Sequence, residues 1–500
     1  MIKSLKFSQV LLKIAQEADL NSILSLSDLA FYKFCVGVSI KHLIKNIESW
    51  DDNIEINSIY DPSYELSGFD KINIFIRLCY ALTKSHFEYC LFALFFRIRN
   101  KTKNLIKRKD LKNFKYVFFS PPNNRNFRSA IAQHKDVCLH AYLPFLNFPF
   151  LAKVNEDHAG NEFVINPILP SVSVVIKIFR HLFKGAINIQ YLIDKVLDKK
   201  YFCFFIKRLY FILIRQQQAK IIVNVLKNKN PEIVAILEND FSGIKLMLAE
   251  ECNNQKIKNV HIQHGTYFSD DLEFIPPISR YFFCCSERER NIQIQAGFNP
   301  KNLFVYGAPI QTLNDSEQYL NSVYPQFDIV VLASRGISQI IIAGMLNDIR
   351  KIFENLTLKL RHDPAIKKEE QLYLENMISN TVISKNKKLI EDIMSGRILL
   401  TFSEDAMISC LRQKKKTIFC PNFERADKGV YGFLSNMPFI RVVTSSLALI
   451  EAINYFFEIP DEEYMVLVDD DFIDYNFGIS DLSKVQNNIF RFLEEVRTNP

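Results

Sequence analysis

Three short apolar runs between residues 257 and 309 constrain the fold of this chain more than any other feature. Each run ends at a turn or at the start of a helix, and the runs cover residues 259–263, 280–285 and 303–306. A helical pattern over residues 287–296 lies between the last two runs. Because alternating short strands and helices are typical of βαβ units, this stretch predicts part of a parallel β-sheet.

Polar and glycine residues follow two of these predicted strands. Ligands of open parallel sheets bind outside the carboxyl ends of the strands. Glycine at such an end allows a ligand to approach the backbone closely. The candidate site residues at these two ends are Gln263, His264 and Gly265 after the first run, and Gly307, Ala308 and Pro309 after the third.

Composition indicates an ordinary globular chain with more than one core. Five hundred residues are too many for a single compact core, and 48% hydrophobic residues supply ample core material. The 14 glycines are too few to favour a glycine-rich nucleotide loop. The ten cysteines form no CxxC pair, which predicts reduced thiols in a cytoplasmic protein rather than a disulfide framework.

The net charge of +7 is spread unevenly along the chain. Basic residues cluster at 97–115 and recur along 177–215, and such surfaces can meet anionic lipid, a phosphorylated substrate or only solvent. Aromatic residues are not interleaved with these basic residues as in a base-stacking platform, which argues against nucleic acid as a partner.

Two apolar stretches, residues 72–96 and 201–214, are interrupted by charged residues. Neither offers about 20 clean apolar residues, so both predict core helices or helices at a membrane surface rather than membrane spans. The first 16 residues lack the pattern of a secretory signal peptide. We therefore expect a cytoplasmic protein, with peripheral contact at the inner, anionic face of the membrane as the accompanying hypothesis.

The order of predicted elements divides the chain into four regions. Residues 1–110 are mainly helical and carry no motif. Residues 111–315 form a first α/β domain with a helical insertion at about 171–227, and residues 147–168 are predicted to be a loop. Residues 326–450 form a second α/β domain, and helices with an acidic tail close the chain at 451–500. The predicted strands outside the first stretch are 115–120, 137–143, 233–237, 327–333, 356–361, 397–402 and 416–420, with one more inside 368–394. Two such domains in series predict a bilobed enzyme that binds a nucleotide-linked substrate in its cleft.

Four motifs at successive predicted strand ends together resemble a known group of enzymes. The set resembles the GT-B fold enzymes that build bacterial surface polymers, namely capsule polysaccharide transferases with CMP-activated sugars of the Kdo and sialic acid types and CDP-glycerol glycerophosphotransferases. The resemblance covers roughly residues 115–446. Its motifs are Gln263-His264-Gly265, Gly307-Ala308-Pro309, His362-Asp363-Pro364 and the block from Ser403 to Pro421.

The sequence departs from the pattern of these enzymes at two points. Asp363 splits the usual His-Pro pair, and Glu404 stands where a second Ser or Thr often follows Ser403. The resemblance implies two Rossmann-like domains facing across a cleft, a metal-independent glycosyltransferase activity and no cofactor besides the nucleotide-sugar substrate. The acidic run at 469–471 is accordingly interpreted as solvated surface rather than a metal site.

Site roles follow from the resemblance combined with the chemistry of each residue. Donor binding requires cations, hydroxyls or helix N-termini for the leaving phosphate, and the acceptor hydroxyl requires a base. The plain structural alternatives are a core histidine for His362 and an N-cap for Ser403 or Asp240. The expected donor-binding residues are Arg335, His362, Ser403, Glu404, Gly307 and Pro309, the expected acceptor-binding residues are Gln263, Gly265 and Arg125, and the expected catalytic residues are His264 with Glu238 and Asp240 as competing bases.

The leading hypothesis from the sequence is a glycosyltransferase. Its donor is a nucleotide-activated sugar, CMP-linked by resemblance, and its acceptor is a surface polysaccharide or a lipid-linked glycan. Three alternatives stay open. These are a CDP-polyol phosphotransferase, a nucleotide-sugar epimerase that needs no acceptor, and a non-catalytic scaffold of a polysaccharide assembly complex.

Overall fold

The computed structural model forms two compact units, Met1–Ile262 with Ile275–Phe283 and Phe492–Pro500, and Gln263–Phe274 with Cys284–Arg491. The residues that the structure describes are 68–99, 111–120, 134, 136–142, 162–164, 173, 175–176, 180, 201–237, 243–263, 278–308, 325–334, 337–364, 366–378, 380–386, 388–421 and 430–499. The helical structure predicted for residues 1–67 lies outside these ranges.

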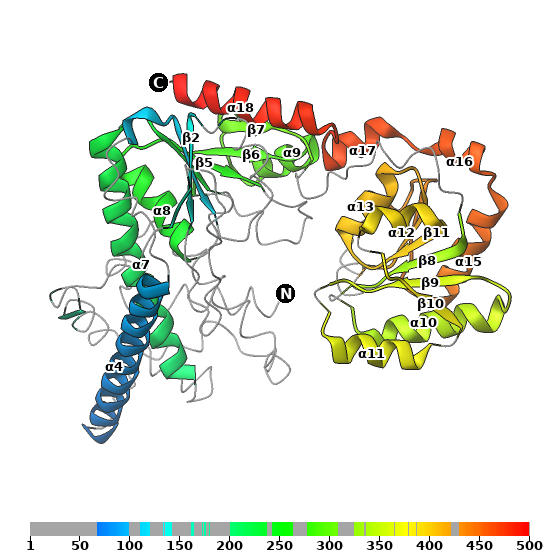
Figure 1. Ribbon diagram of the computed structural model, residues 1–500, viewed down its shortest axis with the longest axis horizontal. Helices are drawn as coiled ribbons and strands as arrows, with labels where there is room; N and C mark the ends of the chain where they lie inside the picture. Colours follow the sequence, from blue (N-terminus) through cyan, green and yellow to red (C-terminus); the bar gives the residue numbers. More distant parts are fainter. Residues whose placement is uncertain are drawn as a thin grey trace. The chain divides into compact units, whose positions relative to one another are not determined.

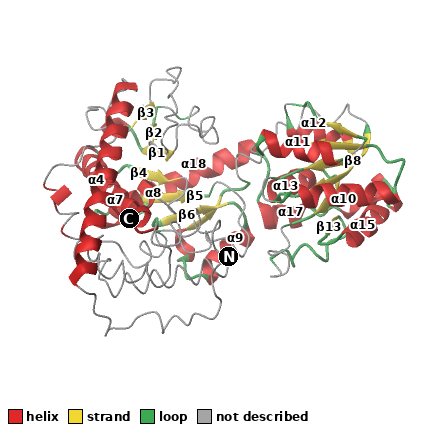
Figure 2. Cartoon of the chain, turned by 90° about the horizontal axis from the view of Figure 1, so that it is seen from below, coloured by secondary structure: helices red, strands yellow, loops and turns green. Residues whose placement is uncertain are grey.

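The first sheet has seven strands in the order β3-β2-β1-β4-β5-β6-β7. Figure 2 shows β3 to β6 in this order across the sheet. The pairs from β3 to β6 are parallel. Numbered by sequence, 3-2-1-4-5-6 is the strand order of a doubly wound Rossmann-type sheet. The strands are β1 (Tyr116–Ser120), β2 (Cys138–Tyr142), β3 (Glu162–Val164), β4 (Val234–Leu237), β5 (Asn259–Ile262), β6 (Tyr281–Cys284) and β7 (Leu303–Val305).

Continuous apolar runs explain why the central strands form. All four residues of β4, β5 and β6 are buried, as expected for parallel strands covered on both faces. The predictions of these strands and of β1, β2 and β7 are confirmed to within about two residues. The loop predicted at 147–168 is wrong, because it contains β3. Three residues at a sheet edge are too few for an alternation of apolar and polar residues to be recognised.

Two long helices, α4 (Gly68–Arg99) and α7 (Tyr201–Lys229), pack together in the first unit (Figures 1 and 2). Nδ1 of His86 lies 2.6 Å from the hydroxyl of Tyr210, and Glu88 pairs with Lys207. The helices thus have a buried side, although α4 also keeps Ile76 and Phe87 60% and 63% exposed. Among the helices that the structure describes, none is long and apolar enough to cross a membrane.

The second sheet has six strands in the order β10-β9-β8-β11-β12-β13, and all of its neighbouring pairs are parallel. This is again the order 3-2-1-4-5-6. The prediction missed β13, and it placed the other five strands correctly. The strands are β8 (Phe327–Leu332), β9 (Leu358–Arg361), β10 (Thr381–Ile383), β11 (Gly396–Thr401), β12 (Lys416–Phe419) and β13 (Ile440–Val442).

Helices cover both faces of the second sheet. Figure 1 shows α12 and α13 on one side of β8 and β9, with α10 and α11 on the other. Alternate residues of β8 accordingly enter two cores, since Val330 and Leu332 pack with α12 and α13, whereas Ile329 and Val331 pack with α10 and α15. These helices are α10 (Gln339–Ile352), α11 (Lys368–Met377), α12 (Leu389–Ser395), α13 (Glu404–Arg412) and α15 (Ser446–Glu458).

Three further helices close the chain, as predicted: α16 (Asp461–Leu467), α17 (Asp470–Phe477) and α18 (Leu482–Thr498). The end of α18 belongs to the first unit, where Glu494 accepts a hydrogen bond of 2.5 Å from the hydroxyl of Tyr116. In the acidic run, Asp469 caps α17 and Asp470 pairs with Lys414 at 2.7 Å.

Candidate functional site

The switch point of the second sheet lies between β8 and β11, the two strands at which the strand order reverses. Helices α10 and α13 leave these strands toward opposite faces, and ligands of doubly wound sheets bind at the carboxyl ends of such strands. The backbone N–H of Phe402 donates to the carbonyl of Leu332 at 3.3 Å, so the two strand ends lie side by side. The donor-binding residues predicted in this sheet follow β8, β9 and β11 and therefore belong to one edge.

His362 follows β9 at this edge and is held by a carboxylate. Its Nε2 lies 2.9 Å from Oε1 of Glu375 on α11, and its side chain is only 9% exposed. The buried Nδ1 atom has no hydrogen-bond partner among the described residues. Since Glu375 accepts the Nε2 proton, Nδ1 is the nitrogen left to accept or donate a further hydrogen bond.

Arg361, which precedes His362, has a structural partner. Its guanidinium contacts the fully buried Asp392 carboxylate at 2.5 Å, and Lys359 contacts the same carboxylate at 2.7 Å. This ion-pair group anchors β9 to α12. Breaking a buried pair leaves an uncompensated charge, so the arrangement fixes the strand that positions His362.

Ser403 is the N-cap of α13, the role that the sequence left open as its alternative. Its Oγ accepts the backbone N–H of Ala406 at 3.3 Å, and Oγ1 of Thr401 donates to its carbonyl at 3.0 Å. Glu404 accepts a hydrogen bond of 2.6 Å from the hydroxyl of Tyr431. The Ser403 hydroxyl proton stays available for a ligand, whereas Glu404 is engaged.

Negative charge gathers at the start of α13. Loss of hydration raises the pKa of Asp405, and the carboxylates of Glu404 and Asp363 raise that pKa further, so both lie within electrostatic reach of Asp405. The Asp405 residue as a whole keeps contact with solvent. The partial positive charge of a helix N-terminus is thus already offset by the chain's own carboxylates, which disfavours a phosphate at this helix end.

Gln263 and Gly307, predicted to contact ligands, lie in a packed part of the second unit. Oε1 of the buried Gln263 accepts the backbone N–H of Cys285 at 3.3 Å, and the hydroxyl of Tyr306 donates to the Gln263 carbonyl at 2.6 Å. Gly307 has φ +119°, and a Cβ there would lie 2.7 Å from Val485 of α18. Gln263 and Gly307 therefore have structural roles, and their ligand contacts stay predictions.

Several predicted residues lie outside the part of the chain that the structure describes. Two of these residues follow neighbouring strands. Strand β4 ends just before Glu238 and pairs with β5, which ends two residues before His264. The predicted residues in question are Arg125, Glu238, Asp240, His264, Gly265, Pro309 and Arg335.

Sequence reasoning missed three residues that shape this edge. Glu375 and Tyr431 are distant in sequence from the groups that they bind, and no local pattern reveals such pairs. Gln339 is the first residue of α10 and directly follows Ser338. A polar residue at the start of a helix was the one signal in the sequence that could have pointed to it.

Comparisons with known proteins concern the fold. No protein-family model and no curated protein matches this chain. Among solved structures, UDP-GlcNAc 2-epimerases from Neisseria meningitidis, bound to UDP-GlcNAc, and from Methanocaldococcus jannaschii are 12% and 14% identical, with TM-scores of 0.46 and 0.43. Each match covers 76% of this chain and 99% of the other chain. A chain of the GtfA/B complex is 15% identical, with a TM-score of 0.39 and coverages of 56% and 61%. The strand orders themselves define two Rossmann-like domains in series, the domain content of the predicted GT-B fold.

Proposed function

We propose that this protein is an enzyme that acts on a nucleotide-activated sugar, and that it transfers the sugar to a glycan or lipid-linked acceptor. The observation that carries the proposal is His362 at the switch-point edge of the second sheet. Its Nε2 is fixed by Glu375, while its buried Nδ1 lacks a partner among the described residues. An unsatisfied buried nitrogen is uncommon and calls for an explanation, and a ribose hydroxyl or phosphate oxygen of a nucleotide would satisfy it.

The chemistry of transfer assigns roles to the other candidates. Arg335, in the β8–α10 connection, would supply positive charge to the leaving phosphate, and Ser403 would donate its hydroxyl proton to another oxygen of the donor. His264, Glu238 or Asp240 would remove the proton of the acceptor hydroxyl. A cytidine nucleotide is the preferred donor because of the resemblance to CMP-sugar and CDP-glycerol enzymes.

A nucleotide-sugar epimerase is the second candidate, and Asp405 is the observation in its favour. Loss of hydration raises the pKa of its carboxyl, helped by Glu404 and Asp363, so this group holds a proton more tightly than an ordinary Asp side chain. An epimerase would convert the nucleotide-sugar without any acceptor, so the two activities are separable by assay.

The first experiment is thermal-shift titration of the full chain with CMP, CDP, UDP, UMP and GDP. Stabilisation by a cytidine nucleotide is expected, and His362→Ala should raise its Kd at least tenfold, which corresponds to about 1.4 kcal/mol. His134→Ala, a partly exposed histidine of the first unit, is the matched control and should leave the Kd unchanged.

Product analysis then separates the candidates. Both transfer reactions release CMP when an acceptor is present, so the group found on the acceptor separates them: a sugar without phosphate supports the transferase, and a polyol phosphate supports the phosphotransferase. Conversion of the donor without any acceptor supports the epimerase. If none of the nucleotides stabilises the protein, the proposal of a nucleotide-sugar enzyme is wrong and the scaffold hypothesis takes its place.

A further inference from the structure

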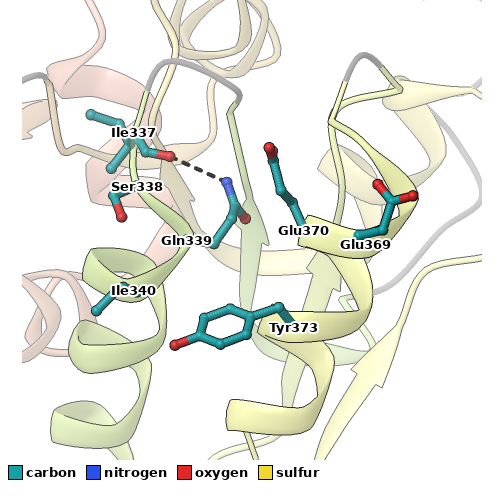
Figure 3. Close-up of a pocket in the computed structure, with 7 residues that line it drawn as sticks. All are labelled: Ile337, Ser338, Gln339, Ile340, Glu369, Glu370 and Tyr373. Carbon is teal, nitrogen blue, oxygen red and sulfur yellow. Dashed lines mark hydrogen bonds between the residues drawn. The ribbon is translucent and has the colours of Figure 1, made fainter.

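A pocket of about 510 Å³ lies between the first turns of α10 and α11 in the second unit (Figure 3). Its volume falls within the range of small-molecule sites. None of the donor, acceptor or catalytic residues proposed above lines it. The lining residues are Ile337, Ser338, Gln339, Ile340, Glu369, Glu370 and Tyr373.

The buried side chain of Gln339 is oriented by its own loop. Its Nε2 donates to the carbonyls of Ile337 at 3.2 Å and Ser334 at 3.4 Å. Because both partners only accept hydrogen bonds, the amide nitrogen must face them and the oxygen must face away. Figure 3 shows the nitrogen toward Ile337 and the oxygen on the other side of the side chain.

The oxygen of Gln339 lacks a donor among the residues that the structure describes. The residue is 8% exposed, and Oε1 accepts no hydrogen bond from any residue that the structure describes. A buried acceptor without a donor costs about 1–3 kcal/mol, so a hydrogen-bond donor on a ligand would be favourable here. The side chain therefore indicates a ligand that donates.

The rest of the lining selects a neutral, hydroxyl-rich ligand. Glu369 and Glu370 present carboxylates, which accept hydrogen bonds from hydroxyls and repel phosphate or carboxylate groups. The Ser338 side chain makes no capping bond to α10 and can donate or accept. The rings and alkyl groups of Tyr373 and Ile340 offer apolar surface for the C–H face of a sugar ring.

We infer that this pocket binds an uncharged sugar ring through its hydroxyl groups. The inference rests on the proposed function and deepens it, since it names neutral sugars as the class recognised in the second unit. Sugars of the Kdo and sialic acid types carry a carboxylate, so the ring belongs to the acceptor glycan or to a donor that carries a neutral sugar instead.

Saturation-transfer NMR on the full chain tests the inference with four probes. The neutral probes are methyl glucoside and methyl N-acetylglucosaminide, and the charged probes are the methyl glycoside of sialic acid and glucosamine. We expect saturation transfer to at least one neutral probe and none to the sialic acid probe. Binding of the sialic acid probe alone, binding of glucosamine alone, or no transfer to either neutral probe would overturn the inference.

Variants locate the binding to this pocket. Gln339→Met removes the acceptor, Glu370→Gln removes an exposed charge without a risk to folding, and Tyr373→Ala removes the ring. Each should weaken the neutral sugar at least fivefold. Leu372→Ala changes an exposed side chain of α11 that does not line the pocket, so this control should bind normally. Unchanged sugar binding in Glu370→Gln and Tyr373→Ala would contradict the inference.

Two arms separate the sugar's source and the two proposals. If saturating CMP leaves the saturation-transfer signal of the free sugar intact, an acceptor site separate from the nucleotide is supported. If CMP leaves that signal intact but an intact CMP-sugar abolishes it, the ring of the donor is supported. Sugar binding without any nucleotide stabilisation supports this inference while it overturns the proposed function. Stabilisation by a nucleotide without any sugar binding supports the proposed function and overturns this inference.

Discussion

The N-terminal ends of α10 and α13 hold equivalent places in the second sheet but differ in chemistry. Both helices follow the strands of the switch point. At α13, Ser403 caps the helix and Tyr431 binds Glu404. At α10, the Ser338 side chain forms no cap and Oε1 of Gln339 has no donor in the described part of the chain. The first end is satisfied by the protein itself, and the second leaves polar groups for a ligand.

This difference teaches that topology alone does not identify a ligand site. A helix N-terminus attracts an anion only while its charge and N–H groups are free. Glu404 and Asp405 have already taken that place at α13, so a phosphate would have to compete with them. The predictions below test whether the two helix ends really differ in this way.

The largest effect is expected at Asp392, the anchor of β9. Asp392→Asn leaves Lys359 and Arg361 without a buried counter-charge, and we expect a loss of about 3 kcal/mol in the free energy of unfolding. Urea denaturation measures this loss. Asp470→Asn, at a pair with a 67% exposed carboxylate, should cost less than about 0.5 kcal/mol. Equal losses in the two variants would contradict the anchoring role.

Tyr431 should matter next, because its hydroxyl holds Glu404. Tyr431→Phe keeps the buried ring and removes the hydroxyl that donates the hydrogen bond of 2.6 Å to the carboxylate, at an expected cost of about 1.5 kcal/mol. Thermal and urea unfolding measure the effect. The double variant with Glu404→Gln provides the control, since its cost should be less than additive if the two groups act as a pair.

The capping difference gives a direct comparison of the two helices. Ser403→Ala should cost about 1 kcal/mol, because the bond to the N–H of Ala406 is lost. Ser338→Ala should change the free energy of unfolding by less than about 0.3 kcal/mol, because its side chain makes no cap bond. Urea denaturation of both variants measures the difference. If the two losses are equal, the two helix ends are alike and the contrast drawn here is wrong.

The sequence predicted the two sheets well for a physical reason. Buried parallel strands such as β5 and β8 are continuous apolar runs, which are visible without any structure. Of the edge strands with three residues each, β7 and β10 were predicted from the alternation of strands and helices around them, whereas β3 and β13 were missed. Pairing with a neighbour already in place forms the two missed strands. Tertiary context therefore decides them, and local patterns do not.

The site was less predictable than the fold. His362 and Ser403 were found because they follow strong strands. Their partners Glu375 and Ala406, and the free oxygen of Gln339, depend on side-chain directions that a sequence does not record. The sequence could identify the edge at which a site forms, but not which of its groups are already satisfied.

The smallest effect concerns pH and the carboxyl of Asp405. Its pKa is raised in the folded state by burial and by Glu404 and Asp363, so the folded protein binds its proton more tightly than the unfolded chain. Stability from this group is therefore present below the unfolded pKa and falls as pH rises through the folded value. Asp405→Asn should remove that fall, with a gain at pH 7 below about 1 kcal/mol after solvent screening and no gain near pH 3.5. Glu494→Gln, whose carboxyl has a pKa lowered to about 2 by Arg497 and Tyr116, should behave oppositely, because its loss of stability grows as pH rises from about 2 and is complete above about pH 4.5. Urea denaturation at pH 3.5, 5 and 7 measures both curves, and a gain for Asp405→Asn that is constant with pH would show that this carboxyl is not destabilised by its acidic neighbours.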